Sequence, residues 1–138
     1  MTGCAKLETL YCDDNRLTRL DVSKNGKLDW LTCAGNALKA LDVTGCKALM
    51  YLDCGDNRLT ALDVSRNAKL EFLYTNGNPI KTLDLKHNRI LRGYLKNKLW
   101  KEKDGVYWSY EGDSDLWGLG IDYATTLTSG SKVLYQGR

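Results

Sequence analysis

The sequence predicts a leucine-rich repeat solenoid, because the chain repeats itself every 21 residues through four successive units. Within each unit a leucine is followed two residues later by cysteine or threonine, and three residues after that by asparagine. These columns are Leu10, Leu31, Leu52 and Leu73; Cys12, Cys33, Cys54 and Thr75; and Asn15, Asn36, Asn57 and Asn78. Such units stack as coils around a shared core. We therefore expect a parallel β-sheet on a concave face, extended or 3-10 segments on the convex face, and a small β-rich C-terminal cap.

The first half of each unit predicts a short β-strand, since apolar side chains alternate there, as at Leu31 and Cys33. Strands of neighbouring coils are expected to pair in parallel, about 4.8 Å apart, and to turn these two side chains into the core. The asparagine column lies where the chain leaves the strand. A side-chain amide carries donors and an acceptor, so it can satisfy backbone groups that the sheet does not reach.

The second half of each unit predicts an extended segment on the opposite face, as in the sequence Leu-Asp-Val-Ser at residues 20–23. A unit of this length leaves little room for a regular helix. An aspartate returns in every unit, at Asp21, Asp42, Asp63 and Asp84. We interpret this column as bonding local backbone or serine groups rather than a metal ion.

The cysteine column predicts free thiols, with Cys12, Cys33 and Cys54 as small buried residues that fill a narrow core. Cys12, Cys33 and Cys54 would point inward in parallel from successive coils, which places their sulfur atoms badly for a disulfide. Cys4 and Cys46 lie two coils apart, about 10 Å, which is too far to bridge. The spacing of a zinc site is absent, and the one histidine, His87, falls in a surface column. We expect neither a metal nor a cofactor.

The repeat ends after Leu91, because Tyr94 replaces the strand leucine and Lys96 replaces the cysteine. A lysine buried there without a partner would be unfavourable. We therefore divide the chain into repeats over residues 1–91 and a β-rich C-terminal cap over residues 92–138, which covers the last coil. Alternation and turn residues predict strands at 106–110, 118–128 and 132–136. Three tryptophans are expected to form the core of this cap: Trp100, Trp108 and Trp117.

Length and composition indicate one domain and argue against two classes of partner. The chain has 138 residues and a formal net charge of +3. This charge is spread along the chain, and we interpret the basic stretch 92–103 as solvated surface, so nucleic acid is not an expected partner. The longest apolar stretch is far shorter than the roughly 18 to 20 residues that span a bilayer. The opening residues 2–4 match residues 44–46, so the chain is expected to begin within a repeat of a longer protein.

The repeats resemble those of bacterial internalins. Residues 17–25 read LTRLDVSKN and residues 59–67 read LTALDVSRN, which are typical of that family. The cysteine column makes the resemblance closest to the internalin J-like type, whose repeats carry a cysteine ladder. The resemblance covers about residues 2 to 91. It implies a bacterial, secreted or surface-displayed protein, adhesin-like in character, which binds a macromolecule through its concave face.

Outward positions of the strands predict a binding surface on the concave face. Trp30, Tyr51 and Phe72 share one column, and Tyr11, Asp53 and Tyr74 share the next. An aromatic ladder that only stabilises the sheet is the alternative. Contiguous exposed aromatic rings more often mark a contact surface, for a protein or a glycan. The small residues Ala34 and Gly55 in a third column would leave room beside the rings.

Three classes of function follow from this pattern. The first is a non-enzymatic binding module that uses the six concave-face residues. The alternative is a structural or assembly segment, in which the N-terminal edge at residues 4–12 continues a longer array or pairs with another copy. An enzyme is disfavoured, because the single histidine lies on the surface and no glycine-rich phosphate loop is present.

Overall fold

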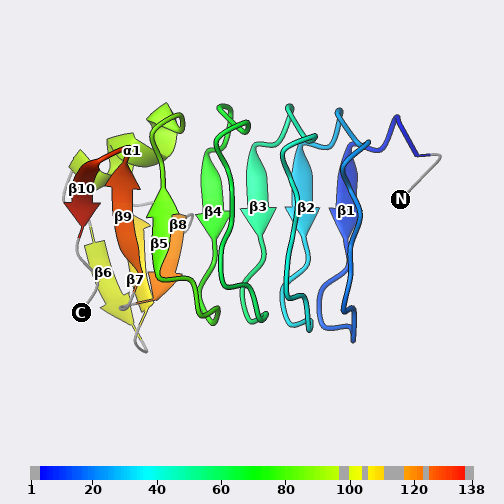
Figure 1. The fold of residues 1–138 in the computed structure, drawn as a ribbon, viewed down its shortest axis with the longest axis horizontal. Helices are drawn as coiled ribbons and strands as arrows, with labels where there is room; N and C mark the ends of the chain where they lie inside the picture. Colours follow the sequence, from blue (N-terminus) through cyan, green and yellow to red (C-terminus); the bar gives the residue numbers. More distant parts are fainter. Residues whose placement is uncertain (1–3, 97–99, 104–105, 111–116, 123–124, 136–138) are drawn as a thin grey trace.

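The computed structural model describes residues 4–96, 100–103, 106–110, 117–122 and 125–135 (Figure 1). Each 21-residue unit contributes one short strand, and these strands lie side by side in one row: β1 (Thr9–Tyr11), β2 (Trp30–Thr32), β3 (Tyr51–Asp53) and β4 (Phe72–Tyr74). The pairing is parallel, and its register equals one repeat, since Leu31 pairs with Leu10 on one side and Leu52 on the other. The predicted parallel sheet of a leucine-rich repeat solenoid is therefore present.

The core runs through the coils behind this sheet. Leucines of the strands and of the segments before and after them are fully buried, among them Leu28, Leu31, Leu38, Leu49, Leu52, Leu59, Leu70 and Leu73. Each buried leucine contributes about 1.5–3 kcal/mol relative to an exposed one. A single coil has no partner for this apolar edge, so stability is shared between neighbouring coils.

The predicted asparagine ladder forms at the end of each strand. In the buried example, Asn57 Nδ2 donates to the carbonyl oxygens of Cys33 (2.9 Å), Cys54 (3.2 Å) and Gly55 (2.9 Å). Its Oδ1 accepts from the backbone N–H of Leu38 at 3.0 Å. One side chain thus satisfies backbone groups in two coils at the turn where the chain leaves the strand.

The opposite face carries the predicted extended segments. Asp21 and Asp42 form an isolated parallel bridge, and residues Thr82–Asp84 form strand β5. The aspartate column bonds locally, as predicted. Asp21 Oδ1 accepts from the backbone N–H of Ser23 at 3.1 Å and from its hydroxyl at 2.7 Å. These bonds, together with smaller charge effects, lower the pKa of the Asp21 carboxyl.

A second column of polar side chains, which the sequence analysis did not assign, lies inside the turn on this opposite side. Asn67 Nδ2 donates to the carbonyls of Val43 (2.9 Å) and Cys46 (2.8 Å). Asn25 and Asn88 make equivalent bonds to preceding coils. Cys46 occupies this column in place of asparagine, and its thiol lies 3.3 Å from the carbonyl oxygen of Val22.

All five cysteines are free thiols. Cys33, Cys46 and Cys54 are fully buried in the apolar core, and Cys12 is half-buried in the first coil. The Sγ atom of Cys54 lies 3.4 Å from the carbonyl oxygen of Tyr74 in the next coil, and Cys12 Sγ lies 3.4 Å from that of Thr32. The buried cysteines thus serve as small core residues, whereas Cys4 is exposed at the N-terminal end of the described chain.

The C-terminal region begins with a helix that the sequence analysis did not predict. Helix α1 (Arg89–Lys96) occupies the segment in which the repeat pattern fails. Strand β7 (Val106–Tyr110) agrees with its prediction, as does β10 (Lys132–Tyr135) within the described residues. The single strand predicted at 118–128 is wrong, because two strands occur there, β8 (Trp117–Asp122) and β9 (Thr126–Ser129). The β6 strand (Trp100–Lys103) was not predicted, and the tryptophan side chains of the cap lie outside the described part of the chain.

Strands β8 and β9 together continue the solenoid as a fifth coil. The β8 strand pairs in parallel with β4, with Leu119 opposite Leu73, whereas β9 pairs in parallel with β5, with Leu127 opposite Leu83. Both Leu119 and Leu127 are fully buried. The order of the larger sheet is β1-β2-β3-β4-β8-β7-β6, and that of the smaller is β10-β9-β5. The segment containing α1, β6 and β7 is therefore inserted between the fourth coil and the fifth.

Candidate functional site

The six predicted site residues all lie on β1–β4, whose outward surface we call the strand face. It is the surface that the repeat pattern predicts to be concave. Tyr11 is 67% exposed and Trp30 is 36% exposed, whereas Tyr74 is only 8% exposed. Tyr51, Phe72 and Asp53 are half-buried. Tyr74 therefore offers little of its ring to a ligand.

The aromatic side chains contact one another across neighbouring strands. Trp30 and Tyr51 are stacked, with ring centroids 3.9 Å apart and an interplanar angle of 3°. Tyr51 also lies 5.7 Å from Phe72 and 5.6 Å from Tyr74, in tilted arrangements, and Tyr11 lies 6.5 Å from Trp30. The structure thus brings the five predicted aromatic residues into one continuous strip centred on Tyr51.

Carboxylates line one side of this strip. Asp53 Oδ1 accepts from the backbone N–H of Gly55 at 3.0 Å. Asp13, which was not included among the predicted site residues, accepts from the Ala34 N–H at 2.8 Å and from the hydroxyl of Thr32. Burial raises the pKa of the Asp53 carboxyl, and the negative charges of Asp13 and Asp56 raise it further against the effect of the Gly55 bond. Burial, and secondarily Asp53, also raises the pKa of the Tyr51 phenol.

A cavity of about 260 Å³ opens beside the aromatic strip. Tyr51, Tyr74 and Asp53 line it together with residues of the turns that follow the strands: Ala34, Gly55, Asp56 and Asn76. This cavity lies at Ala34 and Gly55, where the small side chains predict room beside the rings. Asp56 and Asn76 were not predicted, although the 21-residue repeat places both residues at the ends of strands that carry predicted site residues.

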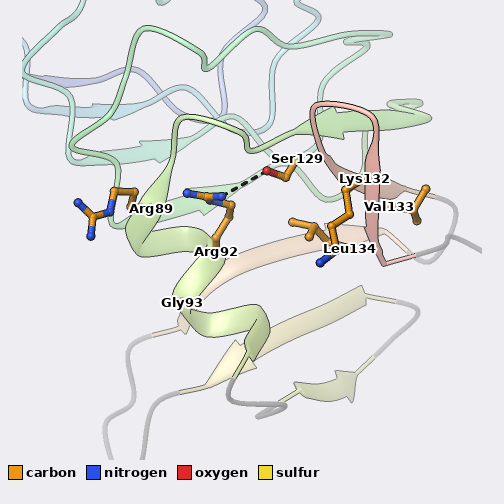
Figure 2. A pocket seen from close by; sticks show the side chains of 7 residues that line it. All are labelled: Arg89, Arg92, Gly93, Ser129, Lys132, Val133 and Leu134. Carbon is orange, nitrogen blue, oxygen red and sulfur yellow. Dashed lines mark hydrogen bonds between the residues drawn. The ribbon is translucent and has the colours of Figure 1, made fainter.

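A second cavity, of about 580 Å³, lies between α1 and the β9–β10 hairpin (Figure 2). Arg89, Arg92 and Lys132 give it a basic lining. Arg92 reaches across from α1 and donates through Nη1 to the hydroxyl of Ser129 at 3.3 Å, whereas the Arg89 guanidinium points away from the hairpin. Gly93, Val133 and Leu134 also line it. None of the described residues that line this cavity is aromatic, and none of them belongs to the predicted site.

Within the described part of the chain, no group of three or more histidine, cysteine, aspartate or glutamate side chains could hold a metal ion. Among the same residues, no helix is long and apolar enough to cross a membrane.

Comparison with solved structures identifies a similar repeat domain. The functional domain of InlJ from Listeria monocytogenes, which includes a cysteine ladder, matches with a TM-score of 0.60 and 42% sequence identity. The match covers 61% of this chain but only 19% of the InlJ chain. No family model and no curated protein matches the sequence. The predicted resemblance to bacterial internalin-like leucine-rich repeat proteins of the cysteine-ladder type is thereby confirmed.

Proposed function

We propose that this chain is a non-enzymatic binding module of an exported, adhesin-like bacterial protein, and that it recognises a macromolecule through the strand face. The observation that carries this proposal is the continuous aromatic strip, in which Tyr11, Trp30, Tyr51 and Phe72 are at least partly exposed. A sheet of three-residue strands can be stabilised by threonine or valine, which expose less apolar area. Tryptophan and tyrosine are the residues most often found at the centres of protein interfaces. Similarity to the InlJ domain supports both the export and the absence of catalysis.

The partner is proposed to be a protein rather than a glycan. Carbohydrate sites use ring faces that are open to a sugar, but the facing surfaces of Trp30 and Tyr51 are closed against each other. The stacked rings are instead flanked by a small cavity and by carboxylates. Such a mixture of apolar and polar groups is typical of a protein interface.

A binding screen tests the proposal. Arrays of glycans and of extracellular protein domains are incubated with the wild-type chain and with the Trp30→Ala/Tyr51→Ala/Phe72→Ala variant, whose fold is checked by circular dichroism. We expect a protein ligand that binds the wild type and loses at least about tenfold in affinity with the variant. A glycan hit would contradict the choice of partner. A hit unaffected by the variant would move the binding site away from the strand face.

Assembly into a longer array is the second candidate. Strand β1 forms the end of the larger sheet, and the leucines of its coil are only half-buried: Leu7, Leu10, Leu17 and Leu20. An apolar coil end of this kind fits another coil or another copy of the chain. Sedimentation velocity over a range of concentrations separates the two functions. Assembly requires concentration-dependent association that Leu10→Lys abolishes and that the triple alanine variant retains.

A further inference from the structure

The charges of the repeats are segregated between the segment that contains each strand and the remainder of each unit. The segments that contain the strands and the turns after them, residues 8–14, 29–35, 50–56 and 71–77, carry no lysine, arginine or histidine. They carry seven acidic residues: Glu8, Asp13, Asp14, Asp29, Asp53, Asp56 and Glu71. The remainder of the same units, residues 15–28, 36–49, 57–70 and 78–91, carries twelve lysines and arginines against four aspartates. The segments that carry the strand face are therefore acidic on a chain whose net charge is +3.

The acidic side chains lie where the aromatic rings are. Asp53 follows Tyr51 by two residues on β3, and both line the cavity of about 260 Å³ together with Asp56 and Tyr74. Asp13 is close enough to Asp53 that its charge disfavours ionisation there. A cation entering this cavity would relieve the repulsion between the carboxylates and would lie beside the side chains of two tyrosines.

We propose that the strand face docks a basic segment of its partner protein, and that the cavity beside Tyr51 and Tyr74 receives an arginine side chain. This inference rests on the proposed function and specifies the chemistry of the partner. The occupant follows from charge complementarity with the seven carboxylates. Arginine suits the cavity better than lysine, because its planar guanidinium packs on aromatic rings and donates several hydrogen bonds to carboxylates at once.

The geometry assigns a role to each side of the cavity. The carboxylates of Asp53 and Asp56 would accept from the guanidinium, while Asn76 contributes a further polar group on the rim. Gly55 leaves the entrance open, since a side chain at that position would come within 3.3 Å of the Asn76 carbonyl and of Asp53 Oδ1. The more remote carboxylates, such as Glu71, would attract the rest of the basic segment through longer-range electrostatics.

Three peptides test the inference directly on the full 138-residue chain. All share a glycine–serine sequence and differ at three positions, which carry arginine, its uncharged isostere citrulline, or glutamate. Each peptide is titrated into 15N-labelled protein and followed by the backbone amide signals of residues 51–56. The titrations are repeated at about 50 mM and about 300 mM salt, because contacts between exposed charges weaken when the Debye length shortens.

Two variants with the same change of charge provide the matched comparison. Asp53→Asn/Asp56→Asn removes two charges from the cavity, and asparagine tolerates the positive φ of 48° at residue 56. Asp42→Asn/Asp63→Asn removes two charges from the opposite face, where an asparagine Oδ1 can still accept the local backbone bonds. Circular dichroism and thermal unfolding establish that both variants are folded.

We expect the arginine peptide alone to give saturable shifts at residues 51–56, with binding about tenfold or more weaker in the cavity variant and unchanged in the control. Equal shifts with the citrulline peptide, equal binding by both variants, or no saturable shift would overturn the inference. The same experiments distinguish failure of this inference from failure of the proposed function. A protein ligand found in the screen that depends on Trp30, Tyr51 and Phe72, yet ignores salt and the cavity variant, would leave the strand face as a binding site with an uncharged partner.

Discussion

The indole of Trp30 lies parallel to the phenol ring of Tyr51, with centroids 3.9 Å apart, because the two residues are directly opposite each other in the register of β2 and β3. This contact predicts an energetic coupling. In a double-mutant cycle with Trp30→Ala and Tyr51→Ala, we expect a coupling free energy of about 0.5–1.5 kcal/mol, measured by urea unfolding. The tilted pair Tyr11 and Trp30, at 6.5 Å, serves as control and should couple more weakly. Strict additivity for Trp30 and Tyr51 would contradict a stabilising stack.

The asparagine ladder predicts a large loss of stability on truncation of its buried members. Asn57→Ala removes three donated bonds and one accepted bond, and leaves the Leu38 N–H without its side-chain acceptor. Because unsatisfied buried groups keep their full desolvation cost, we expect a loss of about 2–4 kcal/mol in the free energy of unfolding. Asn15, the exposed member of the column, bonds only within its own coil and offers the control. Equal losses for Asn57→Ala and Asn15→Ala would show that burial is not decisive.

One residue in the turn after each of β1–β4 has a positive φ, and this residue is alternately aspartate and glycine in successive coils. Gly35 and Gly77 have φ values of 63° and 70°, whereas Asp14 and Asp56 have 51° and 48°. A Cβ atom at Gly35 would collide with the Asp14 carboxylate of the preceding coil. Aspartate in one coil therefore requires glycine in the next.

Gly35→Ala is accordingly expected to destabilise the chain by about 2 kcal/mol, through backbone strain and displacement of Asp14. A Cβ atom at Gly93 in helix α1 would meet no other atom within 4 Å. Gly93→Ala should thus stabilise by about 0.5–1 kcal/mol. Chemical denaturation of both variants measures these changes in the free energy of unfolding. An unchanged free energy for Gly35→Ala would mean that the turn adapts to the added side chain without strain.

The strand positions and the aromatic strip were predictable because the 21-residue period fixes which residues share a column and period two fixes which face they take. Tyr74 illustrates the limit of that argument. Its column predicts an outward ring, but only 8% of Tyr74 is exposed, between Tyr51 on β3 and the neighbouring strand β8. A sequence column predicts to which side of the sheet a side chain points, whereas its burial depends on how the neighbouring side chains pack.

The fifth coil could not be found by periodicity. Leu119 pairs with Leu73 at a separation of 46 residues, and Leu127 pairs with Leu83 at a separation of 44, because a helix and two strands intervene. The charge segregation was, in contrast, visible in the sequence all along. The acidic excess becomes clear only when all seven columns of residues 8–14, 29–35, 50–56 and 71–77 are compared, and not the outward-facing columns alone.

Protonation of the opposite face is expected to destabilise the chain in acid. Local hydrogen bonds, from Ser23 to Asp21 and from Thr44 to Asp42, lower the pKa values of those carboxyls. A carboxyl with a lowered folded pKa contributes stability above its unfolded pKa of about 4, and this contribution is lost as the pH falls through the folded value. Urea midpoints should therefore decrease between about pH 5 and pH 2. Asp42→Asn should flatten that decrease, and an unchanged midpoint in the wild type would contradict the argument.

The contribution of Asp53 to stability depends on pH in the opposite sense, since burial raises the pKa of its carboxyl. Its charged form is less favourable in the folded chain than in the unfolded one, so its contribution improves as the pH falls through the folded pKa. Asp53→Asn should consequently raise the thermal midpoint at neutral pH and bring no such gain in acid. This outcome would be expected of a carboxylate retained for recognition at a cost in stability.

The thiols are expected to react in order of their depth. Cys4 is exposed, and Cys12 is half-buried in the end coil, where burial and the charge of Asp13 raise its pKa. Burial, with a smaller contribution from Asp42, raises the pKa of the Cys46 thiol to about 11, and Cys54 is raised as well. Since the thiolate is the reactive species, a disulfide reagent at about pH 8 should modify one cysteine quickly, a second slowly, and the remaining three only as the chain unfolds. Cys4→Ser should remove the fast phase alone. Rapid modification of all five thiols in the folded chain would mean that the coils open readily, and the core behind the strand face would then be too mobile to hold the aromatic strip in one arrangement.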